Sequence, residues 1–112
     1  MSQKPPNEIL RGHLELILLS ILEPRAMYGF EIAKEASSRT EGYFDFKEGS
    51  LYPALHRLEQ AGWLRHELRE LGRNGKPRKY YLLTEEGIKS LNHKRLEWAR
   101  LAGAIRSVGG EV

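Results

Sequence analysis

The hydrophobic period of the chain changes within residues 49–83, which have the sequence GSLYPALHRLEQAGWLRHELRELGRNGKPRKYYLL. In the first half, apolar residues follow the i, i+3, i+4, i+7 spacing of one helix face, at Leu51, Ala54, Leu55 and Leu58. The second half contains two runs rich in aromatic and aliphatic residues, 63–71 and 78–83, separated by glycines and a proline. The stretch therefore predicts a helix that begins between Lys47 and Ser50, ends at Gly62 and precedes a two-stranded hairpin.

Two more helices are expected before this stretch. Residues 9–22 are almost continuously apolar and precede Pro24, which predicts a first helix. One side of this helix carries Leu10, Leu14, Ile17, Leu18 and Ile21, and a second side carries Ile9, Leu16 and Leu19. Because a helix that is apolar on two sides must bury both, we expect the second side to contact a partner subunit. A short second helix follows Tyr28-Gly29 and ends before Gly42.

A long helix is expected after the hairpin. Thr84 can cap its start, with Glu85 and Glu86 in the first turn, and the helix runs to about Val108. Its length of about 35 Å exceeds what a domain of this size needs for its own core. The 3.5-residue spacing that is typical of helix–helix packing joins Ile88, Leu91, Trp98, Ala102 and Ile105. We therefore expect a dimerisation helix.

The composition argues against several classes of function. The chain has 112 residues, 40% of them hydrophobic, which is enough for one small domain. It has no cysteine, and its four histidines are not spaced as metal ligands, so we expect no metal, no cofactor and no enzyme activity. No apolar run approaches the ~20 residues of a membrane span, and residues 1–8 do not resemble a signal peptide. A cytoplasmic protein is expected.

Positive charge is concentrated in the hairpin. Residues 65–79 carry six Lys and Arg side chains against Glu67 and Glu70, a net charge of +4, whereas the whole chain has +3. A basic segment on a nearly neutral body is typical of an anion-binding element. A solvated hairpin that binds nothing has the same composition.

Three short helices followed by a basic hairpin predict a winged helix-turn-helix. The fold is then mainly α with a small two-stranded β-wing. The expected organisation is a flexible tail over residues 1–8, the winged helix-turn-helix over 9–84, the dimerisation helix over 85–108 and a second tail over 109–112.

Residues 49–59, GSLYPALHRLE, resemble the recognition-helix signature of the PadR family of transcriptional regulators. Residues 10–22 and 28–32 resemble its first helix and the start of its second, and residues 78–87, RKYYLLTEEG, resemble its returning wing strand and the next helix cap. The similarity extends from about Ile9 to Val108, with one long final helix as in the short subtype of the family. Leu82 departs from the pattern, because a polar residue is expected on the outer face of the wing strand.

The resemblance implies that the third helix and the wing contact DNA. On the helix, the candidates lie opposite the apolar stripe or beside the helix start, where they can enter a major groove: Lys47, Gly49, Ser50, Tyr52, Pro53, His56 and Arg57. In the wing, the candidates for phosphate or minor-groove contacts are Arg73, Lys76, Arg78 and Lys79. An ordinary amphipathic surface helix would show the same pattern. The loop GRNGK lacks the spacing of a nucleotide-binding P-loop.

Trp98 lies midway along the last helix, on the side expected to meet a partner. The simplest interpretation is packing in a dimer interface, together with Leu10, Ile17, Ile88, Leu91, Ala102 and Ile105. Some short members of the family bind flat aromatic effectors between subunits, so the resemblance also implies an effector site at Trp98, Arg95 and Leu14. Arg95 could equally pair with a glutamate of the partner.

The sequence therefore predicts a homodimeric, sequence-specific DNA-binding regulator. The resemblance implies a repressor that binds a palindromic operator and is released by a small aromatic effector. A winged-helix module that binds an acidic protein through its basic hairpin is the alternative.

Overall fold

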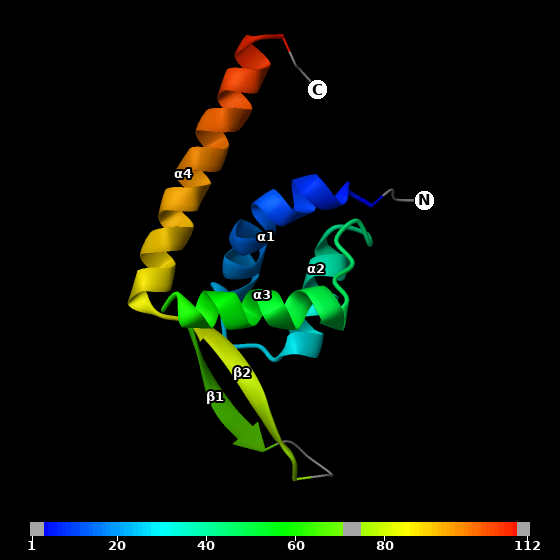
Figure 1. Ribbon diagram of the computed structural model, residues 1–112, viewed down its shortest axis with the longest axis vertical. Helices are drawn as coiled ribbons and strands as arrows, with labels where there is room; N and C mark the ends of the chain where they lie inside the picture. Colours follow the sequence, from blue (N-terminus) through cyan, green and yellow to red (C-terminus); the bar gives the residue numbers. More distant parts are fainter. Residues whose placement is uncertain (1–3, 71–74, 110–112) are drawn as a thin grey trace.

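The order of the elements follows the sequence prediction. The computed structural model describes residues 4–70 and 75–109. The elements are α1 (Asn7–Leu22), α2 (Gly29–Arg39), α3 (Glu48–Gln60), β1 (Leu64–Glu70), β2 (Pro77–Leu83) and α4 (Glu85–Ser107). This order confirms the predicted winged helix fold (Figure 1). The first helix begins two residues earlier than expected, so Asn7 and Glu8 are helical.

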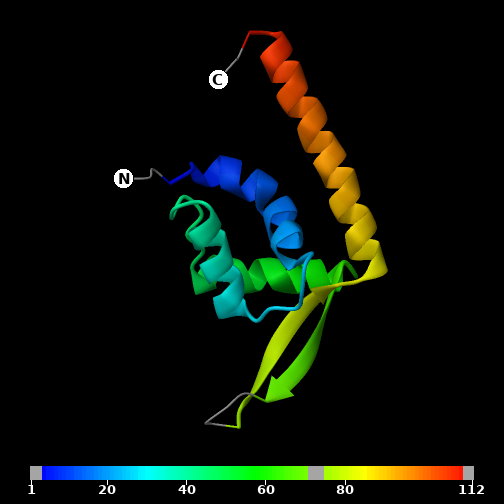
Figure 2. The same ribbon diagram turned by 180° about the vertical axis from the view of Figure 1, so that it is seen from behind.

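The three short helices form the body of the molecule, as Figures 1 and 2 show from opposite sides. The hairpin and α4 leave from the same end of α3 and run in opposite directions. The second half of α4 projects beyond the body. Among the described residues, no helix is both long and apolar enough to cross a membrane.

The apolar stripe predicted on α3 lies at the centre of the core. Its four members, Leu51, Ala54, Leu55 and Leu58, are all buried. They belong to one cluster with Leu18 of α1, Ile32 of α2 and Leu91 of α4. Burying one large aliphatic side chain contributes about 1.5–3 kcal/mol, so this cluster fixes α3 against the other helices and leaves its opposite side exposed.

The hairpin is extended by one short bridge from the helical body. Strands β1 and β2 pair antiparallel, from Leu64 opposite Leu83 to Glu70 opposite Pro77. On the other edge of β2, the Met27 N–H donates to the Tyr81 carbonyl at 3.1 Å, and the Tyr81 N–H donates to the Met27 carbonyl at 2.8 Å. The loop between α1 and α2 therefore lies along β2 and places the start of α2 beside the wing.

The start of α4 is fixed to the start of the wing. The Thr84 hydroxyl caps α4 as predicted, since its Oγ1 accepts from the Gly87 N–H at 3.0 Å. The same hydroxyl donates to the Gly62 carbonyl at 2.6 Å. A Cβ at Gly87 would lie 2.0 Å from the Trp63 carbonyl oxygen, so only glycine allows this close approach.

Candidate nucleic-acid interface

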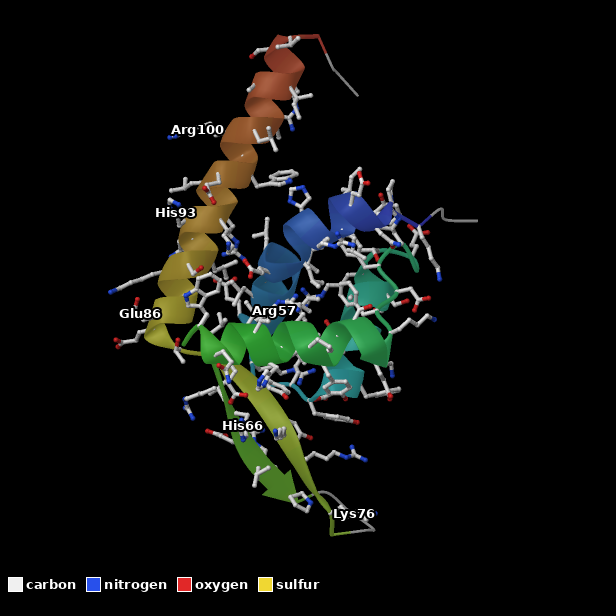
Figure 3. The ribbon with its side chains drawn as sticks, in the orientation of Figure 1. Arg57, His66, Lys76, Glu86, His93 and Arg100 are labelled. Carbon is white, nitrogen blue, oxygen red and sulfur yellow. The ribbon has the colours of Figure 1, made fainter. Side chains whose placement is uncertain are left out.

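The side of α3 opposite its core stripe is open to solvent. The predicted contact residues on this helix and at its start are all exposed: Lys47, Gly49, Ser50, Tyr52, Pro53, His56 and Arg57. Figure 3 labels Arg57 on α3 and Lys76 at the far end of the wing. The exposed surface of α3 is therefore free to contact a partner along most of its length.

Tyr52 is held in place by the start of α2. A Cβ built on Gly29 would lie 2.2 Å from Tyr52 Oη and 2.5 Å from Cζ, so the ring occupies the space of a side chain at position 29. The tyrosine nevertheless stays 42% exposed. Its hydroxyl therefore lies at the N-terminus of α2, where the helix dipole favours an anion.

A groove of about 820 Å³ joins α3, the start of α2 and the wing. Its lining residues are Tyr28, Gly29, Phe30, Tyr52, His56, Arg78, Lys79 and Tyr81. Segments that lie far apart in the sequence thus share one surface. Arg78 and Lys79 give this surface positive charge.

Aromatic rings, not carboxylates, support Arg78. Its guanidinium carbon lies 4.5 Å from the centroid of the Tyr28 ring, which in turn packs against the rings of Tyr80 and Phe30. No described side chain forms an ion pair with Arg78, Lys79 or Lys76. A cation on an aromatic face keeps its charge available, so Arg78 is oriented without being neutralised.

Of the predicted DNA contacts, Lys47 forms an ion pair with a carboxylate, and Arg73 lies outside the described residues. Lys47 Nζ lies 3.1 Å from Asp45 Oδ2, which also pairs with Lys4 at 2.6 Å. Hydrogen bonds from Lys4 and then Lys47 hold the pKa of Asp45 below its usual value, so this carboxylate stays charged and offsets part of the charge of Lys47.

The hydrogen bond between His66 and Glu59 joins the wing to α3 and was not predicted from the sequence. The His66 Nδ1–H donates to the Glu59 carboxylate, and the imidazole ring meets the Tyr81 ring edge-on at 6.1 Å. Burial raises the pKa of the Tyr81 hydroxyl, and the nearby Glu59 carboxylate acts in the same direction. This hydrogen bond joins a residue of α3 to a residue of β1, so the periodicity of the helix or of the strand alone could not predict it.

A second surface lies between α1 and the middle of α4. A cavity of about 170 Å³ there is lined by Gly12, His13, Glu15, Leu16, Lys94, Glu97, Trp98 and Leu101. Of the three predicted effector residues, only Trp98 lines this cavity. Leu14 is buried in the core, and the Arg95 guanidinium donates to both oxygens of Glu23 in the same chain, at 2.7 and 3.2 Å.

The predicted dimer residues fall into two groups. Leu91 is 0% exposed within its own chain, so it belongs to the core and offers no surface to a partner. Ile88, Trp98 and Ile105 are exposed, and Leu10, Ile17 and Ala102 are partly exposed. The first half of α4 packs on the body and the second half does not, and the 3.5-residue spacing does not distinguish them. The spacing therefore predicted Leu91 as an interface residue together with the exposed residues. Leu96 and Leu101 are exposed apolar residues that this spacing missed.

Leu82, the departure from the expected wing pattern, is half-buried on the same face of the hairpin as Tyr80.

Among the described residues, no group of three or more His, Cys, Asp or Glu side chains could hold a metal ion.

Comparison with known proteins agrees with this arrangement. A family model described as "Transcriptional regulator PadR-like family" matches residues 18–93. An uncharacterized protein X of Lysinibacillus sphaericus is 37% identical over 99 residues, which cover 88% of this chain and 90% of that protein.

Two solved structures are similar at 35% sequence identity. A transcriptional regulator from Clostridium thermocellum has a TM-score of 0.81 and covers 90% of this chain and 97% of its own. A PadR family transcription regulator from Clostridium difficile has a TM-score of 0.74 and covers 87% of this chain and 98% of its own. The family match includes α2, α3, the wing and the first part of α4, and the chain therefore belongs to the PadR-like family of transcriptional regulators.

Proposed function

We propose that the protein is a repressor that binds a palindromic operator as a homodimer. The groove shared by α3, α2 and β2 supports this most directly, because its cations Arg78 and Lys79 have no carboxylate partner among the described residues. Duplex DNA carries one negative charge per about 1.7 Å of helix axis. A backbone that follows this groove would meet both cations and the N-terminus of α2.

The exposed side of α3 would enter the major groove. Gly49 and Ser50 at its start are small enough for the backbone to approach base edges closely. Tyr52 and His56 line the groove beside them, and Arg57 can reach a guanine or a phosphate. Lys76 and Lys79 in the wing would contact phosphates and set the orientation of the helix.

The projecting half of α4 supports dimerisation. On this helix, whose second half projects beyond the body (Figure 1), Trp98 is 49% exposed and Ile105 is 54% exposed. Contiguous exposed apolar side chains mark interaction surfaces, and a second copy of the same helix is complementary to them. A two-fold axis at α4 would present two α3 helices to successive major grooves ~34 Å apart.

A small aromatic effector would act at Trp98. The cavity of about 170 Å³ in one chain is smaller than the roughly 300–1,000 Å³ of typical ligand sites, so a second copy must complete the pocket. A flat ligand stacked on Trp98 should quench tryptophan fluorescence in a saturable way and weaken operator binding. Lys94 touches both the cavity and the Trp63 ring, so Trp98→Phe is needed to assign the signal. If aromatic acids and cationic dyes leave the emission unchanged, Trp98 only packs the interface.

Selection from a pool of random duplexes tests the proposed function. We expect the wild-type protein to enrich an inverted repeat whose half-sites lie one helical turn, ~10–10.5 base pairs, or a multiple of it apart. A pool that stays random after several rounds would contradict operator binding. Capture of an acidic protein by the wing in the same preparation would then favour the interaction module.

A further inference from the structure

Arg69 and Arg78 are direct cross-strand neighbours in the wing. The register places Arg69 of β1 opposite Arg78 of β2, and directly opposite residues of an antiparallel pair have Cβ atoms about 4.5–5.5 Å apart. Like charges in this position destabilise a hairpin. The sequence predicted a DNA contact for Arg78 and none for Arg69.

Both guanidinium groups rest on tyrosine rings. The guanidinium carbon of Arg69 lies 4.6 Å from the Tyr80 ring centroid, and that of Arg78 lies 4.5 Å from the Tyr28 ring centroid. The two rings are 5.3 Å apart, and Tyr80 is only 8% exposed. Because Tyr80 is buried and packs against the half-buried Tyr28, the two rings hold each other in place, and both guanidinium groups are oriented before any ligand arrives.

On this face of the hairpin, Glu67 pairs with the two arginines of β1 but not with Arg78. Residues 65, 67 and 69 of β1 and 78, 80 and 82 of β2 share the face, since side chains alternate along a strand. Glu67 accepts from Arg69 at 3.0 Å and from Arg65 at 3.3 Å. These ion pairs are largely solvent-exposed, and exposed pairs contribute little to stability. Glu67 can therefore release Arg69 at small cost.

We propose that Arg69 and Arg78 together bind one backbone phosphate of duplex DNA, and that Glu67 occupies Arg69 until the DNA arrives. Each of the two non-bridging oxygens of a phosphodiester can accept hydrogen bonds from one guanidinium group, and the phosphate is opposite to both groups in charge. Arg78 also lines the groove beside α3, so a phosphate at the edge of that groove is within reach of its neighbour. The inference rests on the proposed DNA binding and adds Arg69 and Glu67 to it.

The structure offers a matched control for the test. Arg65 lies on the same strand and face as Arg69 and pairs with the same carboxylate, but it lies opposite Leu82 instead of Arg78. Arg65→Ala and Arg69→Ala therefore remove the same charge and the same kind of ion pair. Only Arg69→Ala removes a guanidinium next to Arg78.

The affinity for a labelled duplex should be measured by fluorescence anisotropy between about 50 and 200 mM salt. We expect Arg69→Ala to weaken binding about tenfold and to lower the salt slope by about 0.9 for each protomer of the proposed dimer, the value for one phosphate per chain, with a clearly smaller effect for Arg65→Ala. Glu67→Gln should strengthen binding several-fold in the wild-type background and have no effect in the Arg69→Ala background. Thermal unfolding of each variant identifies any loss of folding.

Two results would overturn the inference while leaving DNA binding intact. One is equal affinities and salt slopes for Arg69→Ala and Arg65→Ala. The other is an effect of Glu67→Gln that persists in the Arg69→Ala background, which would mean that Glu67 repels DNA only through its charge. If the wild-type protein binds no duplex, the proposed function fails as well, so the two failures are distinguishable.

Discussion

Single residues decide how closely the elements of the interface approach one another. Gly29 leaves room for the Tyr52 ring at the start of α2, and Gly87 allows α4 to begin against the Trp63 carbonyl. Neither need is visible in the sequence, where Gly29 is one of several glycines in expected turns. Pro53 lies in the second turn of α3 and has no N–H to donate. The Gly49 carbonyl, which would accept from position 53 in a regular helix, is therefore left on the exposed surface.

Gly29→Ala tests the contact between α2 and α3. The new methyl group would lie 2.2 Å from Tyr52 Oη, so the ring must leave its position or α2 must shift. We expect the free energy of unfolding, measured in urea, to fall by about 1–3 kcal/mol. Gly49→Ala is the control, since no atom lies within 4 Å of its Cβ, and it should change stability by less than about 0.5 kcal/mol. Equal stabilities for the two variants would show that Tyr52 does not depend on Gly29.

At the scale of elements, the sequence predicted the helices and the hairpin but not the hydrogen bonds and ion pairs that join them. The periodicity of α3 identified its buried and exposed sides, because burial alternates with the helical repeat. The hairpin followed from its composition, and its partner Met27 in the loop before α2 did not. Arg95 was expected to face a partner or a ligand, but it binds Glu23 at the end of α1, 72 residues away in sequence. A contact over such a separation leaves no local pattern.

The Glu23–Arg95 pair predicts a pH dependence of stability. The hydrogen bond from Arg95 lowers the pKa of Glu23 from its usual value of 4.5. Because the folded-state pKa is the lower one, the pair stabilises the protein above pH 4.5 and loses its contribution as the pH falls through the lowered pKa. A double-mutant cycle with Glu23→Gln and Arg95→Ala should give a coupling of about 0.2–1 kcal/mol at neutral pH, since both side chains are partly exposed.

The same cycle on Glu86 and Lys89 provides the control. That pair is 3.6 Å apart and much more exposed, so its coupling should be close to zero at every pH. A Glu23–Arg95 coupling that stays constant through acid pH would refute the role given to the ion pair.

At the scale of the whole molecule, the main feature is the projecting half of α4, whose apolar side chains stay exposed in the single chain. The sequence predicted this helix and its use in dimerisation from its length and from the 3.5-residue spacing of its apolar residues. The exposure of its side chains depends on how far along α4 the packing against the body continues. A repeat of 3.5 residues does not contain that information. Leu91 was assigned to the interface for this reason, and Leu96 and Leu101 were missed.

Ile105→Glu tests the dimer. A charge in an apolar interface should cost about 3–5 kcal/mol, so light scattering should shift from about twice the chain mass of 12.9 kDa toward the monomer. Lys89→Glu is the control, because Lys89 is exposed in the first half of α4, which packs on the body and lies outside the projecting half. A wild-type protein that is monomeric at micromolar concentration would remove the basis for a two-fold operator complex.

Salt-dependent affinity for DNA tests the proposed regulator most directly. The wild-type protein should be titrated against the selected duplex and a scrambled duplex of equal length, between about 50 and 200 mM salt. We predict that the selected duplex binds at least about 10³-fold more tightly, and that affinity falls by about 10³ or more over this range, as expected for six or more phosphate contacts in a dimer. Equal affinity for both duplexes, or affinity that does not change with salt, would contradict DNA recognition by α3 and the wing.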